Sequence, residues 1–157
     1  MRIEDLSLSE RHGLEFAATV ASIDRLRKLL RWSDPRDEEL QGFLGSLIQN
    51  EERRMGELED AGRRIDRSGP CRLRHAQILA LLKEYFPSFF KHLGECPIDR
   101  EHGMYLAECL EEESSRFYRQ MVRSALDPSS RELFLRLKKE DDSFLQLVRD
   151  VVLGGGD

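Results

Sequence analysis

Cysteine is scarce in this chain of 157 residues, which contains only Cys71, Cys96 and Cys109. Three is an odd number, and no two of these residues form a Cys-x-x-Cys pair. This argues against a disulfide scaffold and against a four-cysteine zinc or rubredoxin site, because both need cysteines in pairs. We expect reduced thiols, and nothing near Cys109 marks it as a nucleophile.

Long hydrophobic runs and an excess of basic residues are also missing. The longest apolar run covers about five residues, 78–82, and the first residues lack a secretory hydrophobic region, whereas a membrane-spanning helix needs roughly 20 apolar residues. The formal net charge is −5, which disfavours binding to a polyanion. We therefore expect a cytoplasmic protein with no nucleic-acid partner and no membrane segment.

The chain is rich in the patterns that start and continue helices. Ser7 and Glu10 have the spacing of a capping box, in which each side chain accepts a hydrogen bond from a backbone N–H at the helix start. Asp34-Pro35 and Asp127-Pro128 are typical of further helix starts. Apolar residues then recur at helical spacing. The sequence predicts long helices over about 8–32, 35–66, 99–125 and 128–153, and a short one over about 73–83.

The two halves of the chain resemble each other. Each half has a long helix, a short turn that ends in Asp-Pro, and a second long helix. Short turns make antiparallel neighbours, and the crossover over 67–98 is long enough to run along a bundle. The sequence therefore predicts an all-α single domain over 1–157, a four-helix bundle made of two antiparallel helical hairpins. The alternative is a chance likeness between two amphipathic hairpins.

Three glutamates stand where the helical stripes should be apolar. Glu51 follows Leu44 and Ile48, Glu111 follows Ala107, and Glu140 follows Leu137. A carboxylate that faces a core must be paired, protonated or bound to a cation. Carboxylates from facing helices commonly hold iron or manganese in helical bundles. The alternative is that all three face water, because each has acidic neighbours.

These motifs resemble the ferritin-like superfamily, and especially its rubrerythrin-like branch. The resemblance rests on Ala107-x3-Glu111-x5-Phe117-Tyr118, on Leu133-Phe134-x2-Leu137-x2-Glu140 and, more weakly, on Leu44-x3-Ile48-x2-Glu51. It implies a ferritin-like bundle with a long crossover. In this family the metal site takes a Glu from the first and third long helices and a Glu-x-x-His from the second and fourth.

The chain departs from the family pattern at three of the six positions. The position on the first helix falls near Thr19, or near Ala21 in a shifted register, and Arg54 and Ser143 replace the two histidines. A guanidinium cannot ligate a metal and stays charged. We therefore expect Arg54 to pair with Glu51 and Glu140 and to supply the positive charge of a former ion. The remaining candidate metal ligands are Glu51, Glu111 and Glu140.

The resemblance and the missing ligands lead to three functional hypotheses. The first is a divergent rubrerythrin-like protein with a reduced carboxylate site, without catalytic residues and at most a weak mononuclear binder of iron or manganese. The second is a di-iron-type oxidoreductase for peroxide reduction or ferrous iron oxidation, which would need an external electron donor because no rubredoxin domain is present. The third is a metal-free helical interaction module.

The remaining features have less specific interpretations. The aromatic block Tyr85–Phe90 predicts packing within the chain together with a homodimer contact. The basic stretch Arg63–His75 contains acidic neighbours and is typical of a solvated helix end. No two of the four histidines share a helix at ligand spacing, so we expect surface or hydrogen-bonded histidines; they are His12, His75, His92 and His102.

Overall fold

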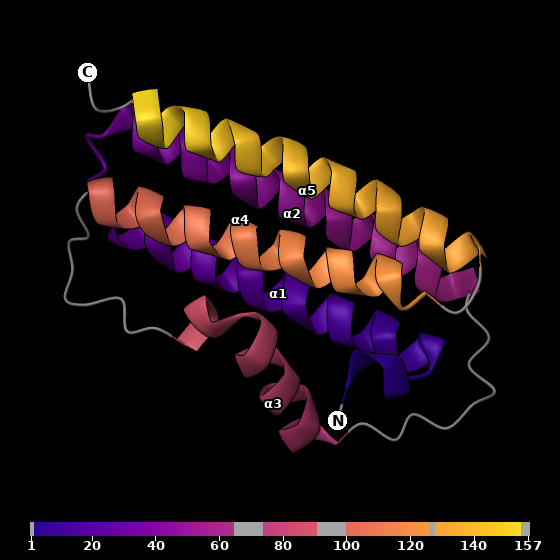
Figure 1. Ribbon diagram of the computed structural model, residues 1–157. Helices are drawn as coiled ribbons and strands as arrows, with labels where there is room; N and C mark the ends of the chain where they lie inside the picture. The colour runs from indigo at the N-terminus through magenta and orange to yellow at the C-terminus, as the bar shows by residue number, and fades with distance from the viewer. Residues whose placement is uncertain (1, 65–73, 91–99, 126–127, 155–157) are drawn as a thin grey trace.

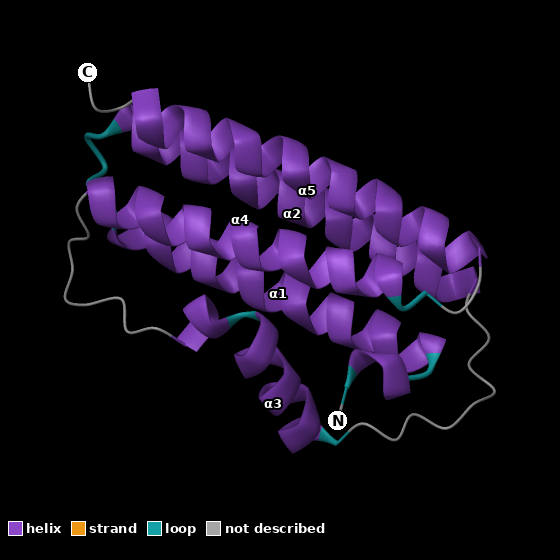
Figure 2. Ribbon diagram, viewed as in Figure 1, coloured by secondary structure: helices purple, strands orange, loops and turns teal. Residues whose placement is uncertain are grey.

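The computed structural model describes residues 2–64, 74–90, 100–125 and 128–154 (Figure 1). In this part of the chain every regular element is helical and none is a strand, so the all-α prediction is confirmed (Figure 2). No described helix is long and apolar enough to cross a membrane. The α-helices are α1 (Leu8–Trp32), α2 (Glu38–Arg64), α3 (His75–Tyr85), α4 (Arg100–Arg123) and α5 (Pro128–Gly154), and the 3₁₀ helices are η1 (Ile3–Asp5) and η2 (Pro87–Phe90).

The four long helices lie side by side along one direction, as Figure 1 shows. The largest helix-helix interfaces are those of α1 with α2 and of α4 with α5, which are the two predicted hairpins. The short helix α3 crosses the outside of this assembly, and both α3 and η2 contact α1 and α4. The chain is therefore a helical assembly of two hairpins, with part of the crossover laid against α1 and α4.

The start of α1 matches the sequence prediction, but the start of α2 does not. The Ser7 hydroxyl accepts a hydrogen bond from the Glu10 backbone N–H at 3.2 Å, and the Glu10 carboxylate accepts one from the Ser7 N–H at 3.0 Å. Before α2, Asp34 and Pro35 instead form a turn, in which Asp34 Oδ1 accepts from the Arg36 N–H at 2.9 Å. Proline suits the second position of such a turn.

The cap of α2 is Asp37, whose carboxylate accepts a hydrogen bond from the Leu40 backbone N–H at 3.1 Å. The helix consequently begins at Glu38, three residues later than the Asp-Pro pattern indicated. At the corresponding turn of the second half, Asp127 lies outside the described residues, and Pro128 is the first residue of α5. Proline is well suited to that first helical position.

The apolar core forms two clusters rather than one. The first joins α1, α2 and α4, and the second joins α1, α2, α4 and α5 with η1 and the crossover. Each of the three helices α1, α2 and α4 contributes to both clusters, so a layer of other residues separates them. The first cluster includes Leu26, Leu29, Leu40, Leu44, Leu47, Met104 and Leu110, and the second includes Ile3, Leu14, Leu58, Phe86, Phe117, Met121, Phe134 and Leu137.

A buried arginine ties the N-terminal segment to the end of α4. Arg11 is 1% exposed, and its guanidinium donates to the backbone oxygens of Leu6 at 3.1 Å and Glu4 at 3.2 Å. It also donates to the backbone oxygen and to the hydroxyl of Ser124. Backbone carbonyls at helix ends lack intrahelical partners, so Arg11 satisfies groups that would otherwise be left unpaired.

The crossover is fixed to the bundle by aromatic packing and by one carboxylate. The Phe86 and Tyr85 rings lie 5.0 Å and 5.7 Å from the Phe117 ring, between centroids. The Glu113 carboxylate accepts hydrogen bonds from the Ser88 backbone N–H at 3.1 Å and from its hydroxyl at 2.8 Å. The predicted packing of the aromatic block within the chain is thus confirmed for Tyr85 and Phe86; the side chains of Phe89 and Phe90 lie outside the described residues.

We predict that Glu113→Ala lowers the free energy of unfolding by about 1–3 kcal/mol, because it strands the buried Ser88 N–H and hydroxyl. Chemical denaturation provides the measurement. The control is Glu132→Ala, which alters an exposed residue of α5 and should change stability by less than about 0.5 kcal/mol. Equal effects of the two changes would contradict a structural role for the Glu113 contact.

Candidate functional site

The layer between the two apolar clusters consists of polar side chains on the inward faces of three helices. Inward-facing residues of α1, α2 and α4 follow alternating spacings of three and four residues, as in bundle seams. On α2, Glu51 and Arg54 lie between Ile48 of the first cluster and Leu58 of the second. On α4, Glu111 lies between Leu110 and Phe117 of the same two clusters. We call the following six buried residues the polar layer: Glu15 and Thr19 of α1, Glu51 and Arg54 of α2, and Glu111 and Tyr118 of α4.

The centre of the polar layer is an ion pair between two consecutive turns of α2. Arg54 Nη1 donates to Glu51 Oε1 at 2.8 Å, and both side chains are at most 2% exposed. The Arg54 guanidinium also lies over the Tyr118 ring, 5.2 Å from its centroid. A cation at this distance from an aromatic face is attracted by the ring quadrupole. Arg54 therefore connects α2 with α4 through the core.

Two further carboxyl groups enter the layer from the neighbouring helices. Glu15 is fully buried, and neither of its carboxyl oxygens has a hydrogen-bond partner within the described residues. Glu111 is 1% exposed, and its Oε2 likewise has no partner there. The positive charge of Arg54 acts on both carboxyl groups. One guanidinium thus faces three carboxyl groups from three helices.

The charge balance of the layer follows from burial. Desolvation raises the pKa of Glu111 to about 8, helped by the nearby Glu51 and opposed by Arg54. Burial also raises the pKa of Glu15 well above its usual range, although Arg54 opposes this. Burial raises the pKa of Glu51 as well, against the charge and hydrogen bond of Arg54. Because Glu51 alone is bonded to the guanidinium among these three, it is the ionised partner. Glu111 keeps its proton up to about pH 8, and burial favours the protonated form of Glu15.

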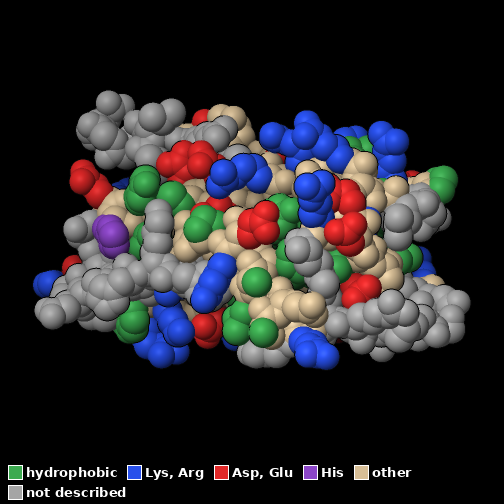
Figure 3. All heavy atoms as spheres, turned by 60° about the horizontal axis from the view of Figure 1, so that its bottom comes forward, with side chains coloured by type: hydrophobic (Ala, Val, Ile, Leu, Met, Phe, Trp, Pro, Cys, Tyr) green, Lys and Arg blue, Asp and Glu red, His purple; other side chains and the backbone are tan. Residues whose placement is uncertain are grey.

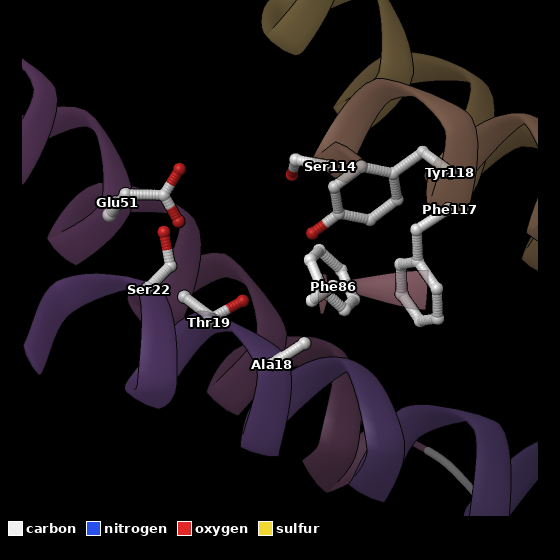
Figure 4. A pocket seen from close by; sticks show the side chains of 8 residues that line it. All are labelled: Ala18, Thr19, Ser22, Glu51, Phe86, Ser114, Phe117 and Tyr118. Carbon is white, nitrogen blue, oxygen red and sulfur yellow. The ribbon is translucent and has the colours of Figure 1, made fainter. Parts of the chain in front are cut away.

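The hydroxyl groups of Thr19 and Tyr118 complete the layer. The Thr19 hydroxyl donates to the Glu15 backbone oxygen at 2.9 Å, and Thr19 shares a side-chain hydrogen bond with Tyr118. Burial raises the pKa of Tyr118, so its phenol stays protonated. Figure 4 shows Glu51 and Thr19 on one side of a small space and Tyr118 on the other. The layer therefore contains hydrogen-bond donors and acceptors from both hairpins.

Glu140, the third predicted ligand, lies at the edge of the layer instead of inside it. Its side chain is 24% exposed, and its Oε1 lies 3.6 Å from Arg53 Nη1. Its charge still acts on Arg54, but its closest described ion-pair partner is Arg53. Leu137 is the fully buried residue of this part of α5, and Glu140 is rotated from it by about 60° at 100° per residue. The expected direct pairing of Arg54 with Glu140 is therefore replaced by a pairing with Arg53.

Ser143 does not occupy a ligand position in this structure. It is exposed, and its hydroxyl donates to the Lys139 backbone oxygen at 3.0 Å. Six residues of helix separate it from Leu137, which turns it by about 120° away from the core. In this structure Ser143 therefore does not share a site with Glu51 and Glu111, and its assignment as a former ligand position stays a prediction.

The sequence motifs placed the first-helix position near Thr19 or Ala21 and did not include Glu15. In the structure Glu15 is fully buried, whereas its neighbour Phe16 is half-buried. Glu15, Thr19, Ser22, Leu26 and Leu29 are separated by four, three, four and three residues, which is the seam spacing of a bundle helix. That spacing was a usable indication that Glu15 points inward.

The arrangement does not fit a resident di-iron centre. Among the described residues, no group of three or more His, Cys, Asp or Glu side chains is placed to hold a metal ion. The Arg54 guanidinium lies among these carboxyl groups; it cannot ligate a metal, it repels a cation, and it is already hydrogen-bonded to Glu51 Oε1. Two iron ions need bridging carboxylates and several terminal ligands. No reaction step through a metal follows from this geometry.

The other predicted features lie apart from the polar layer. His12 Nε2 is 2.5 Å from the Leu58 backbone oxygen, which confirms a hydrogen-bonded histidine. Cys109 is a free, half-buried thiol, whereas Cys71 and Cys96 lie outside the described residues. In the basic stretch, Arg63, Arg64 and Arg74 are exposed, and residues 65–73 lie outside the described part.

No protein-family model, curated protein or solved structure matches this chain. The ferritin-like arrangement therefore stays a prediction that rests on the quoted motifs.

We predict that Glu51→Ala lowers the free energy of unfolding by about 3 kcal/mol, because it leaves the Arg54 charge buried without its partner. Denaturant unfolding measures the change. The matched control is Glu52→Ala on the same turn; Glu52 is exposed and pairs with Arg27 at 2.7 Å, so its loss should cost less than about 1 kcal/mol.

The double variant Glu51→Ala/Arg54→Met should recover part of this loss, since it removes the unpaired charge together with its partner. A change below about 0.5 kcal/mol in Glu51→Ala would contradict a buried ion pair that contributes to stability.

We predict that the free energy of unfolding decreases as the pH rises from about 5 to 8. The unfolded chain releases the Glu111 proton near the ordinary value of 4.5, and the folded chain keeps it until about 8, so unfolding releases a proton in this window. Each retained proton gives a slope of up to about 1.4 kcal/mol per pH unit. Glu111→Gln should flatten the profile, and Glu112→Gln, on the half-buried neighbour, should not. A profile of the same slope in Glu111→Gln and wild type would argue that Glu111 is ionised in the fold.

Proposed function

We propose that this protein is a non-catalytic, ferritin-like helical bundle in which an internal guanidinium occupies the place of a metal centre. Its role is that of a binding or assembly module whose core is held by an ion pair. The proposal keeps the rubrerythrin-like ancestry that the sequence motifs indicate and replaces the reduced metal site with a metal-free polar core. It needs no external electron donor.

The observation that carries the proposal is the buried pair of Arg54 and Glu51. At 2.8 Å, with both groups withdrawn from water, the guanidinium meets the requirement that a buried carboxylate be neutralised. Unlike a bound ion, it is covalently attached, does not exchange with solvent and has no redox chemistry. Burial lowers the pKa of Arg54, but nearby acidic groups, Glu51 above all, outweigh this effect and raise it, so the guanidinium stays charged.

A weak mononuclear metal site is the second candidate, and one observation favours it. The carboxyl oxygens of Glu15 and Oε2 of Glu111 are buried without a hydrogen-bond partner in the described part of the chain. Such oxygens are the donors that hard cations prefer. An ion would have to displace two protons and tolerate the charge of Arg54 nearby. Because of this cost, we expect the metal-free state with the Arg54–Glu51 pair to be more stable than the metal-bound state.

Metal analysis after incubation with ferrous iron or manganese under argon separates the two candidates. We expect protein purified without a chelating tag to retain far less than one ion per chain, since Arg54 already supplies the positive charge. Elemental analysis after desalting provides the measurement, and Glu111→Ala is the matched variant that removes a carboxyl donor.

One ion per chain that is lost in Glu111→Ala would support the mononuclear site. Two iron ions per chain would overturn the proposal in favour of the di-iron oxidoreductase.

The homodimer expected from the sequence also remains a proposal. The exposed large apolar residues of the described part, Val20, Tyr105 and Leu135, lie on three different helices. The face drawn in Figure 3 carries acidic and basic side chains intermixed with apolar ones. A mixed surface of this kind is compatible with a modest, polar-rimmed contact between copies.

A further inference from the structure

A small cavity adjoins the polar layer on the side of α1 and α4. Its volume is about 10 Å³, which is close to the minimum that a single water molecule needs. The crossover covers it, because Phe86 forms part of the wall and packs 5.0 Å from Phe117. The lining residues are Ala18, Thr19, Ser22, Glu51, Phe86, Ser114, Phe117 and Tyr118 (Figure 4).

The chemistry of the lining determines which guest fits. Glu51 offers a carboxylate acceptor, and its partner Arg54 engages Oε1. The Ser22 hydroxyl can donate one hydrogen bond and accept others, and the Tyr118 oxygen, which shares a hydrogen bond with Thr19, has a further lone pair that can accept one. In Figure 4 the Ser22 and Glu51 oxygens face each other, and the Tyr118 hydroxyl points toward them from α4. A guest between these groups must both donate and accept hydrogen bonds.

Water is the guest that satisfies both the size and the polarity. Cavities that stay empty are lined by apolar side chains, whereas buried waters are found where two to four polar partners converge. An empty space here would leave one side of the Glu51 carboxylate facing a void, which is costly for a buried charge. A larger ligand is excluded by the volume.

We propose that this cavity binds one ordered water molecule, which hydrogen-bonds Glu51 and Ser22 of the first hairpin and the Tyr118 oxygen of α4. The water thereby joins the two hairpins at the height of the polar layer. This inference is independent of the metal question, because the cavity lies beside the ion pair and requires no ion.

The test compares Ala18→Val with Ala17→Val. The Ala18 methyl group lines the cavity, whereas Ala17 is a half-buried neighbour on the same helix that does not line it. Both changes place a β-branched residue in α1, so their helix-propensity costs are matched. If the cavity holds water, the added methyl groups displace it and strip Glu51 of a hydrogen bond. We expect the Tm of Ala18→Val to fall below that of Ala17→Val by about 3 °C or more.

A high-resolution crystal structure of the wild type supplies the second measurement. We expect one peak of electron density within hydrogen-bond distance of Glu51 and Ser22, without anomalous signal, and its loss in Ala18→Val. An empty cavity in the wild type would overturn the proposal, even if Ala18→Val were destabilised by overpacking. A Tm for Ala18→Val equal to or above that of Ala17→Val would overturn it too, as would a metal's anomalous signal at the peak.

Discussion

The whole core is organised around one constraint, which is that the charge of Arg54 must be neutralised far from water. An unpaired charge at that depth would cost several kcal/mol. The Glu51 carboxylate neutralises it, with its Oε1 2.8 Å from Arg54 Nη1. The remaining carboxyl groups cannot all ionise around a single cation. Burial raises the pKa values of Glu15 and Glu111 and so favours their protonated, neutral forms. The protonation state of the layer is thus a consequence of its position.

The polar layer also explains why the core is divided. Apolar residues above and below it form two separate clusters, and α1, α2 and α4 each pass through both. If one helix slid along another by a turn, a carboxyl group would face leucine and the guanidinium would lose its partner. Buried polar groups can in this way select one helix register at some cost in stability. The contact of Arg11 with the Ser124 backbone oxygen acts at the C-terminal end of α4, and that of Glu113 with the Ser88 backbone N–H acts at the crossover.

The contacts within the polar layer also disfavour metal coordination. A metal centre needs ligands that are free to coordinate, whereas here Glu51 is held by Arg54 and Glu140 lies at the edge beside Arg53. In the polar layer, the cation that pairs with a carboxylate is the Arg54 side chain. Such a core can stabilise a helical module and set its helix register. This is the physical basis of the proposed non-catalytic role.

The sequence by itself determined the helices, the two hairpins and the presence of carboxyl groups on inward faces, because helical periodicity and capping are local properties of the chain. It also identified Arg54 as the counter-charge of Glu51, since the two stand three residues apart on one helix. Only the tertiary structure decided that Glu15 enters the layer, that Glu140 stays at the edge and that Ser143 faces solvent. These positions depend on how each helix is rotated about its axis by its neighbours. A rotation of some tens of degrees exchanges a buried glutamate for a solvated one, and the packing of the other helices sets it.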